Sequence, residues 1–311
     1  MNKKKIRIGV VGLGGIGGFV GGLLANHYHR GSSVEVIFIC RGATLEKILQ
    51  NGLDLETKGQ ILNVHPAIAA EKPEDIGLLD LLIIAVKTYS LRQVLQRYIT
   101  CLGEHSIVIS LQNSVNAKNE ISQIITHSHI LDGCIYVASN VAAPGVVKHL
   151  GGPGKIYFGT SINADAYKWL EKTFRVAGIN ASFTANIQEV LWQKFLFVSP
   201  VAAITSAYGK TFGELTKEPY TGQLRRMMQE IYELASAKGI CLSESAKDDA
   251  LKMMEKFPYE TKSSMQLDYE HGRPTEIEAL VEFVVKSSSR YNLPAQEYKK
   301  IYHNIQQQYG Y

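Results

Sequence analysis

The sequence predicts an α/β protein with a doubly wound, largely parallel sheet in its N-terminal part and an all-helical C-terminal part. Short apolar runs alternate with helical patterns up to residue 185, and from residue 186 the apolar residues recur with a helical period. A chain of 311 residues is also too long for one ordinary core. We therefore expect two domains, residues 1–185 and 186–311.

The predicted sheet depends on runs that are apolar on both faces, as in buried parallel strands. These runs are residues 6–11, 34–39, 81–86 and 107–111. Helices are expected between them at residues 17–29, 90–102 and 117–125. Strands at 130–137, 145–149, 156–158 and 180–183, with a helix at 166–176, would complete the first domain.

A glycine-rich turn directly follows the first apolar run. Its residues are Gly12, Leu13, Gly14, Gly15, Ile16 and Gly17. In a dinucleotide site, Gly12 would allow the tight turn, Gly14 the approach of backbone to a pyrophosphate, and Gly17 the close packing of the next helix. The helix N-terminus would then face the anion. Glycines at this spacing also occur in ordinary loops. The predicted strand before the turn and the predicted helix after it favour the dinucleotide site, and with it a Rossmann-type NADP-binding domain.

The end of the second strand should decide which dinucleotide binds. An acidic residue there would bond the ribose of NAD, whereas a basic one would accept the extra phosphate of NADP. The chain has Arg41 and no carboxylate at this point, and a guanidinium suits phosphate. We predict NADP (NADPH) as cofactor; the alternative is that Arg41 is an ordinary solvated residue.

Lys87 and Asn113 each follow a predicted strand. The carboxyl edge of an open α/β sheet normally faces the ligand. Each residue alone could be an ordinary loop residue, but both beside a dinucleotide motif are candidates for the site.

The expected C-terminal helices hold three further candidates. Asn186 and Glu189 form a capping-box pattern that would open a long helix. Lys194 in this helix is surrounded by apolar residues. Burial would lower its pKa and suit it to proton donation, unless its stem packs while its ammonium reaches water. Glu276 starts an apolar-faced helix, where the helix dipole favours a carboxylate. Ser264 could cap a helix or lie in a loop.

Composition excludes several classes of protein. The net charge of +4 is spread along the chain without a long basic block, so we expect a small-molecule partner and no nucleic acid. The 4 cysteines include no CxxC pair, which predicts neither a metal site nor a disulfide scaffold and favours a cytoplasmic location. Lys3, Lys4 and Lys5 precede an apolar stretch, but its glycines make a poor signal-peptide helix. We expect no membrane span.

Together these motifs resemble the ketopantoate reductases, NADP-dependent enzymes that reduce 2-dehydropantoate (ketopantoate) to pantoate on the route to coenzyme A. The resemblance spans nearly the whole chain. It rests on the glycine turn, Val86-Lys87, Leu111-Gln112-Asn113, Pro144 to Gly151, Trp192 to Lys194, and Ser263 to Ile277.

The resemblance implies a role for each candidate. Lys194 matches the general acid, and Glu276 matches the acidic residue that supports it. Asn113 and Ser264 match residues around the cofactor and the substrate carboxylate. Lys87 matches the active-site lysine of the nucleotide domain. A possible homodimer is also expected, since helical domains of this kind often expose an interface.

The sequence departs from the family pattern just after the lysine. Asparagines usually stand four and eight residues on, where they share its helical face, but here these positions are Val198 and Ala202. Ser114 likewise replaces a glycine. Ser199 and Thr205 are the candidates to supply a compensating hydroxyl. Three functions therefore remain open: ketopantoate reductase, a reductase of another 2-oxo or 3-hydroxy acid, and a non-catalytic dinucleotide sensor.

Overall fold

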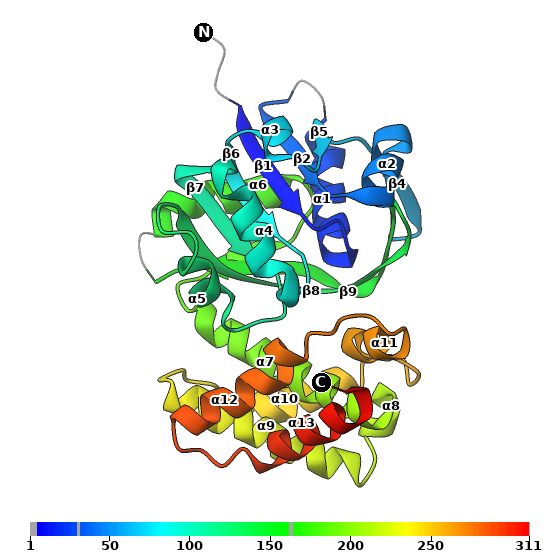
Figure 1. The fold of residues 1–311 in the computed structure, drawn as a ribbon, viewed down its shortest axis with the longest axis vertical. Coiled ribbons are helices and arrows are strands. Elements are labelled where there is room, and N and C mark those ends of the chain that lie inside the picture. Colours follow the sequence, from blue (N-terminus) through cyan, green and yellow to red (C-terminus); the bar gives the residue numbers. More distant parts are fainter. Residues whose placement is uncertain (1–4, 30–31, 162–163, 311) are drawn as a thin grey trace. The chain divides into compact units, whose positions relative to one another are not determined.

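The computed structural model describes residues 5–29, 32–161 and 164–310 (Figure 1). The chain divides into two compact units. Unit 1 comprises Met1–Gln112 and Asn116–Ile187, and unit 2 comprises Asn113–Val115 and Gln188–Tyr311. Lys3 and Lys4, which belong to the signal-like segment of the sequence, lie outside the described residues. A sheet with helices in unit 1 and helices in unit 2 confirm the predicted fold class.

Six parallel strands form the centre of unit 1. In spatial order they are β5 (Ile68–Ala70), β2 (Val34–Ile39), β1 (Ile6–Val11), β6 (Leu79–Ile84), β7 (Leu102–Ser110) and β8 (His129–Ala143). Counted along the chain, these six strands lie in the order 3-2-1-4-5-6, which is that of the dinucleotide-binding doubly wound sheet. In such a sheet the direction of winding reverses between the first and the fourth strand of the chain. The reversal therefore falls between β1 and β6.

The same sheet continues beyond β8 into strands of mixed direction. They are β9 (Val146–Gly159), β3 (Leu53–Thr57), β4 (Gln60–Val64) and β10 (Ala181–Phe183). Strand β9 is antiparallel to β8, and β4 is antiparallel to β3. Helix α1 (Gly15–His27) contacts β1 and β2 near one end of the strand order and β3 and β4 at the other. The sheet therefore wraps around α1.

Short helices connect the strands of unit 1. They are α2 (Gly42–Asn51), α3 (Pro73–Ile76), η1 (Thr88–Ser90), α4 (Leu91–Tyr98), η2 (Ile99–Cys101), α5 (Ala117–Ser122), η3 (Ala164–Tyr167) and α6 (Lys168–Val176). No element was predicted between residues 42 and 80, because β4 is mostly exposed and gives no apolar run. The two strands predicted at 145–149 and 156–158 are one strand, β9, whose pairing with β8 shifts register near its glycines.

Unit 2 is helical. Its elements are α7 (Ile187–Tyr208), α8 (Phe212–Leu215), α9 (Tyr220–Ala237), α10 (Ala246–Met254), α11 (Ser264–Glu270), the π-helical turn η4 (Glu278–Glu282), α12 (Phe283–Arg290) and α13 (Gln296–Tyr309). Their apolar side chains form one core around α7, in which Trp192 and Tyr298 are among the largest buried residues.

Helix α7 corrects one expectation. No stretch was expected to be apolar and long enough to cross a bilayer, yet α7 has 22 residues and an 18-residue window of mean hydropathy 1.3. Of that window, 78% is buried inside the protein, as in the core helix of a soluble protein. A helix packed on all sides is apolar all round.

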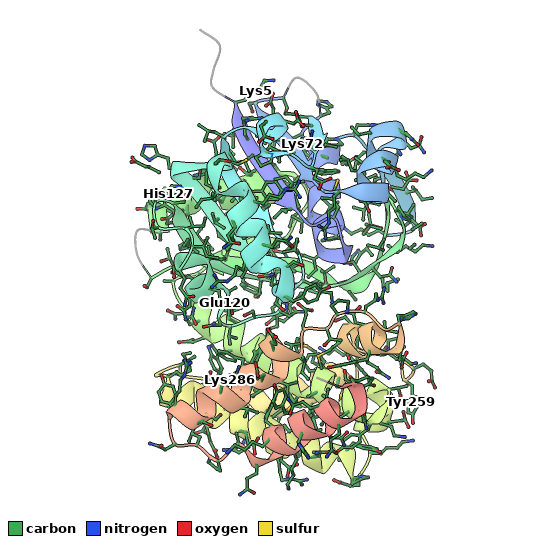
Figure 2. All side chains as sticks on the ribbon, in the orientation of Figure 1. Lys5, Lys72, Glu120, His127, Tyr259 and Lys286 are labelled. Atoms are coloured by element: carbon green, nitrogen blue, oxygen red, sulfur yellow. The ribbon has the colours of Figure 1, made fainter. Side chains whose placement is uncertain are left out.

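Charged side chains cover the outside of each unit, as Lys5, Lys72 and Lys286 illustrate (Figure 2).

Candidate functional site

The glycine turn of unit 1 is shaped by close backbone packing. Gly12 has φ +89°, and a Cβ there would stand 2.6 Å from Cγ1 of Val86, just after β6. A Cβ on Gly17 would overlap the carbonyl oxygen of Gly12. These two positions therefore require glycine, one for the turn and the other for the contact between α1 and the turn.

Gly14 differs from both, because no atom of the described residues, apart from Gly14 and its chain neighbours, lies within 4 Å of the position that its Cβ would occupy. It is the N-cap residue of α1, so the first amides of that helix begin at a point where backbone borders open space. Leu13 and Ile16 pack into the core of unit 1. A Cβ on Gly15 would collide with the Ser139 carbonyl of β8. A pyrophosphate can thus meet backbone N–H groups at this turn, which fits a dinucleotide.

The end of β6 is held beside this turn. The N–H of Ala85 donates to the Val11 carbonyl at 3.0 Å. The side-chain amide of Gln112 donates to the Val86 carbonyl at 2.9 Å, and Gln112 itself is buried. Gln112 was predicted only as part of a motif, without a role of its own. The available signal was its position directly after an apolar strand.

Lys87 follows Val86 and is the N-cap residue of η1. It is partly buried and stands where the sheet reverses its winding. Arg41 lies after β2, at the N-cap of α2, and is exposed. Among the described residues, the Arg41 guanidinium has no hydrogen bond or ion pair. The structure therefore brings the glycine turn, Lys87 and Arg41 to the carboxyl edge of one sheet.

Lys194 and Asn113 meet in unit 2, although 81 positions separate them. The Lys194 ammonium on α7 donates to Oδ1 of Asn113 at 2.8 Å, and both side chains are partly buried. Asn113 lies within the predicted N-terminal domain in sequence, but it belongs to unit 2. An amide oxygen thus holds the ammonium at a defined point.

One face of α7 extends from Lys194 to the start of α11. Residues at i, i+4, i+8 and i+11 share a helical face, and here they are Lys194, Val198, Ala202 and Thr205. The Thr205 hydroxyl lies 2.7 Å from the hydroxyl of Ser263. Asn113 thus contacts one end of this face and Ser263 the other.

Ser263, which was not singled out as a site residue, is buried and caps α11 by accepting the N–H of Gln266 at 3.1 Å. Ser264, the predicted site residue, is the first residue of α11 and is exposed. Of two adjacent serines before a helix, sequence alone does not indicate which hydroxyl turns back to cap. Here Ser263 serves the fold and Ser264 faces outward.

Neither proposed compensating hydroxyl faces open space. Ser199 is fully buried and bonds the Leu280 carbonyl and the Tyr298 hydroxyl. Thr205 is fully buried and donates back to the Val201 carbonyl at 2.8 Å. The idea that Ser199 or Thr205 replaces the missing asparagines is therefore wrong, because core packing already engages both groups.

Glu276 is only 4% exposed. The sequence predicted that Glu276 stands in the first turn of a helix. The Glu276 carbonyl instead accepts the N–H groups of Ala279 and Leu280, so this residue directly precedes the helix. The favourable helix dipole, by which the sequence explained Glu276, does not account for its burial. Moving a carboxyl group out of water costs free energy that bonded partners must offset. The preceding turn is fixed by an ion pair of 3.2 Å between Arg273 and Asp268.

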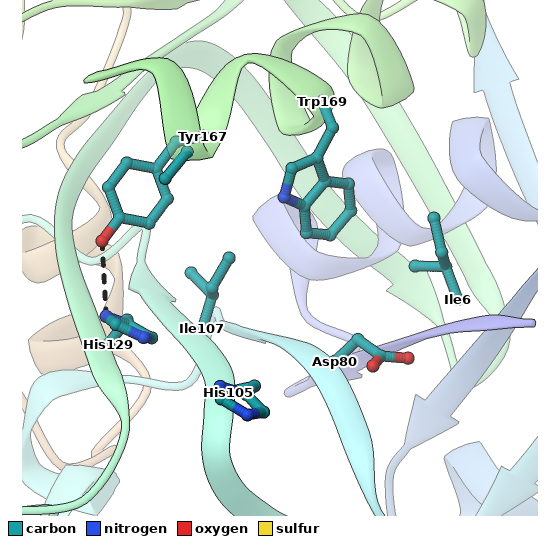
Figure 3. A pocket seen from close by; sticks show the side chains of 8 residues that line it. Ile6, Asp80, His105, Ile107, His129, Tyr167 and Trp169 are labelled. Carbon is teal, nitrogen blue, oxygen red and sulfur yellow. Dashed lines mark hydrogen bonds between the residues drawn. The ribbon is translucent and has the colours of Figure 1, made fainter. Parts of the chain in front are cut away.

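Unit 1 also has a cavity of about 370 Å³, drawn in Figure 3. Its lining includes Ile6 and His129, the first residues of β1 and β8, and Asp80 at the start of β6, with Tyr167 and Trp169 above them. The cavity therefore lies at the amino edge of the sheet, opposite the glycine turn. We place the candidate site at the carboxyl edge, where ligands of such sheets bind. The described residues include no cluster of ligands for a metal ion.

Comparisons with known proteins agree along most of the chain. The family model "Ketopantoate reductase PanE/ApbA" matches residues 8–163, and its C-terminal model matches residues 186–309. The chain is 25% identical over 300 residues to the "Uncharacterized oxidoreductase YkpB" of Bacillus subtilis, covering 96% of this chain and 97% of that protein. It is 28% identical over 305 residues to 2-dehydropantoate 2-reductase of Mesorhizobium japonicum, covering 90% of each. The crystal structure of 2-dehydropantoate 2-reductase from Geobacter metallireducens superposes with TM-score 0.89 at 24% identity, covering 97% of this chain and 100% of that one.

Proposed function

Because the chain belongs to the ketopantoate reductase family, we propose that it uses NADPH to reduce the C2 ketone of a 2-oxo acid. Membership makes it an NAD(P)-dependent oxidoreductase. The choice of NADPH, the acid and the roles of individual residues are the proposal. The single observation that carries it is the ammonium of Lys194 fixed by Asn113 on a face of α7.

In this proposal the residues of unit 1 bind the cofactor. The backbone of Gly12 to Gly17 holds the pyrophosphate at the N-terminus of α1. Arg41 binds the 2′-phosphate that distinguishes NADPH from NADH, and its support is an exposed guanidinium at the N-cap of α2. Lys87 lies at the strand end nearest the turn and contacts the same ligand.

The residues of unit 2 complete the reaction. When bound, NADPH supplies a hydride to the substrate's C2. The Lys194 ammonium donates a hydrogen bond to the ketone oxygen, stabilises its developing negative charge and gives it a proton, so that a hydroxyl forms. The neutral amine then regains a proton from water. Asn113 positions the ammonium through the 2.8 Å bond.

Glu276 keeps Lys194 protonated in this proposal. Apolar surroundings disfavour the charged form of a lysine, whereas a carboxylate in the same unit favours it. Its support is burial: a carboxyl group that is 4% exposed serves a purpose other than solubility. Ser264, exposed at the first position of α11, binds the substrate carboxylate.

Ketopantoate is the first candidate substrate, since relatives such as the Mesorhizobium enzyme carry that activity in their names. Another 2-oxo acid is the second candidate, and the apolar Val198 and Ala202 favour it. A non-catalytic sensor has no need for a fixed ammonium and a buried carboxyl group. A cytoplasmic location and a homodimer stay predictions.

The experiment compares turnover with cofactor binding. We expect Lys194→Ala and Glu276→Gln to lower kcat about 10²- to 10⁴-fold, the range for a lost general acid. NADPH affinity, measured by nucleotide fluorescence, should stay within about twofold of the parent. Equal losses of turnover and NADPH binding, or unchanged turnover in either variant, would contradict these roles. A parent protein that binds NADPH but reduces no 2-oxo acid would support the sensor. Lys210→Ala, which removes a lysine paired with Glu214 in unit 2, is the control.

A further inference from the structure

The face of α7 beyond Lys194 is apolar. Val198 stands one helical turn, about 6 Å, further along the axis, and Ala202 stands two turns along. Val198 is partly buried and Ala202 is 3% exposed. A substrate whose ketone oxygen meets the Lys194 ammonium must extend along the protein beside it, and Val198 is the next side chain on that face toward the C-terminal end of α7.

None of the serine or threonine hydroxyls of α7 corrects this apolar character. Thr205 shares the face, but its hydroxyl is bonded to the Val201 carbonyl and to Ser263. Ser199 and Ser206 are both buried. At 100° per residue, they lie roughly 120–140° around the helix from Lys194. A polar substituent on the substrate would therefore find no partner along this stretch of α7.

We propose that the preferred substrate is a 2-oxo acid with an unsubstituted, branched hydrocarbon side chain, not one that carries a hydroxyl. This inference rests on the proposed function and names its substrate class. Burying a hydroxyl against Val198 removes its hydrogen bonds to water without replacing them. The same valine contacts methyl groups favourably, because it removes apolar surface from water.

The size of the effect follows from a known asymmetry. A site built to bond a hydroxyl rejects a substrate without one by about 10⁴-fold or more, whereas an apolar site rejects an added hydroxyl by only about 10²-fold. The chain should therefore reduce a hydroxylated acid slowly rather than not at all.

A matched substrate pair tests the proposal. Ketopantoate and 3,3-dimethyl-2-oxobutanoate differ only by the 4-hydroxyl group. With NADPH and the full chain, we expect kcat/KM for the hydroxyl-free acid to be about 10- to 100-fold higher. An equal or higher kcat/KM for ketopantoate would overturn the inference and leave the proposed function standing. Reduction of neither acid, with NADPH still bound, would instead overturn the proposed function.

Val198→Asn then locates the effect. An amide at this position can bond the 4-hydroxyl, so the ratio of the two kcat/KM values should shift toward ketopantoate by about tenfold or more. Val190→Asn is the control, because Val190 is a partly buried valine of α7 one turn before Lys194. A shift of the same size in Val190→Asn, or no shift in Val198→Asn, would contradict the role of Val198. A melting temperature for each variant checks that it is folded.

Discussion

The glycine turn of unit 1 and the Lys194 face of unit 2 present their chemistry in opposite ways. At the turn, side chains are missing: Gly12 and Gly17 pack backbone on backbone, and Gly14 leaves open space at the start of α1. On α7, side chains make the defining contacts. Lys194 is held by Asn113, and Thr205 by Ser263.

This contrast explains why the two regions differ in how they accept change. A backbone site is specified by consecutive residues, and its constraints are steric. A side-chain site joins residues that are remote in sequence, and each can be replaced without loss of the helix that carries it. Substitution of the close-packed glycines should therefore destabilise unit 1, whereas substitution of Lys194 or Val198 should alter chemistry or specificity.

The largest expected effect separates two glycines of the turn. Gly17→Ala places a methyl group against the Gly12 carbonyl and should destabilise unit 1 by about 1–3 kcal/mol, the usual cost of overpacking. Gly14→Ala meets no atom within 4 Å, so its stability should change by about 1 kcal/mol at most, while NADPH binding weakens because the pyrophosphate loses its approach. Thermal unfolding and NADPH titration measure the two quantities. Equal stability of both variants would break the comparison.

A smaller effect concerns the choice of cofactor. Arg41→Asp should weaken NADPH binding about 10- to 100-fold, as expected for a lost charged hydrogen bond, and should leave NADH binding little changed. Because Arg41 is exposed, the melting temperature should not move. Lys47→Asp, the same change of charge at an exposed residue of α2, is the control. If both variants lose NADPH affinity equally, long-range charge rather than a phosphate contact is responsible.

The smallest effect separates the paired serines. Ser263→Ala loses the α11 cap and the bond to Thr205 and should cost unit 2 about 1–2 kcal/mol. Ser264→Ala changes an exposed hydroxyl, so stability should stay within about 0.5 kcal/mol, while KM for the 2-oxo acid rises. Denaturant unfolding and steady-state kinetics distinguish them. A stability loss in Ser264→Ala would show that the two roles have been exchanged.

Sequence patterns predicted much of unit 1 correctly. Strands β1 and β2 begin and end at the predicted residues, because buried parallel strands are uninterrupted apolar runs. The hairpin of β3 and β4 was missed, since its exposed residues mix with apolar ones.

The neighbouring residues in the sequence were enough to select the candidate residues. They did not predict which candidates contact one another or which are buried. Asn113 was assigned to the first domain because it follows a strand, yet it bonds Lys194 in unit 2. Glu276 was explained by a helix dipole, and its burial became evident only when the chain folded. Ser199 and Thr205 were candidates to bind substrate until their bonds inside the core were known.

The sequence by itself determined the family, the fold class, the glycine turn and the choice of Lys194, Glu276 and Arg41 as candidates, because each depends on consecutive residues or on a local period. Only the tertiary structure decided that Asn113 holds Lys194, that Ser263 rather than Ser264 caps α11, and that neither Ser199 nor Thr205 offsets Val198. Hydrogen bonds and burial depend on residues from distant parts of the chain. A local periodic pattern does not specify which distant residues will contact one another.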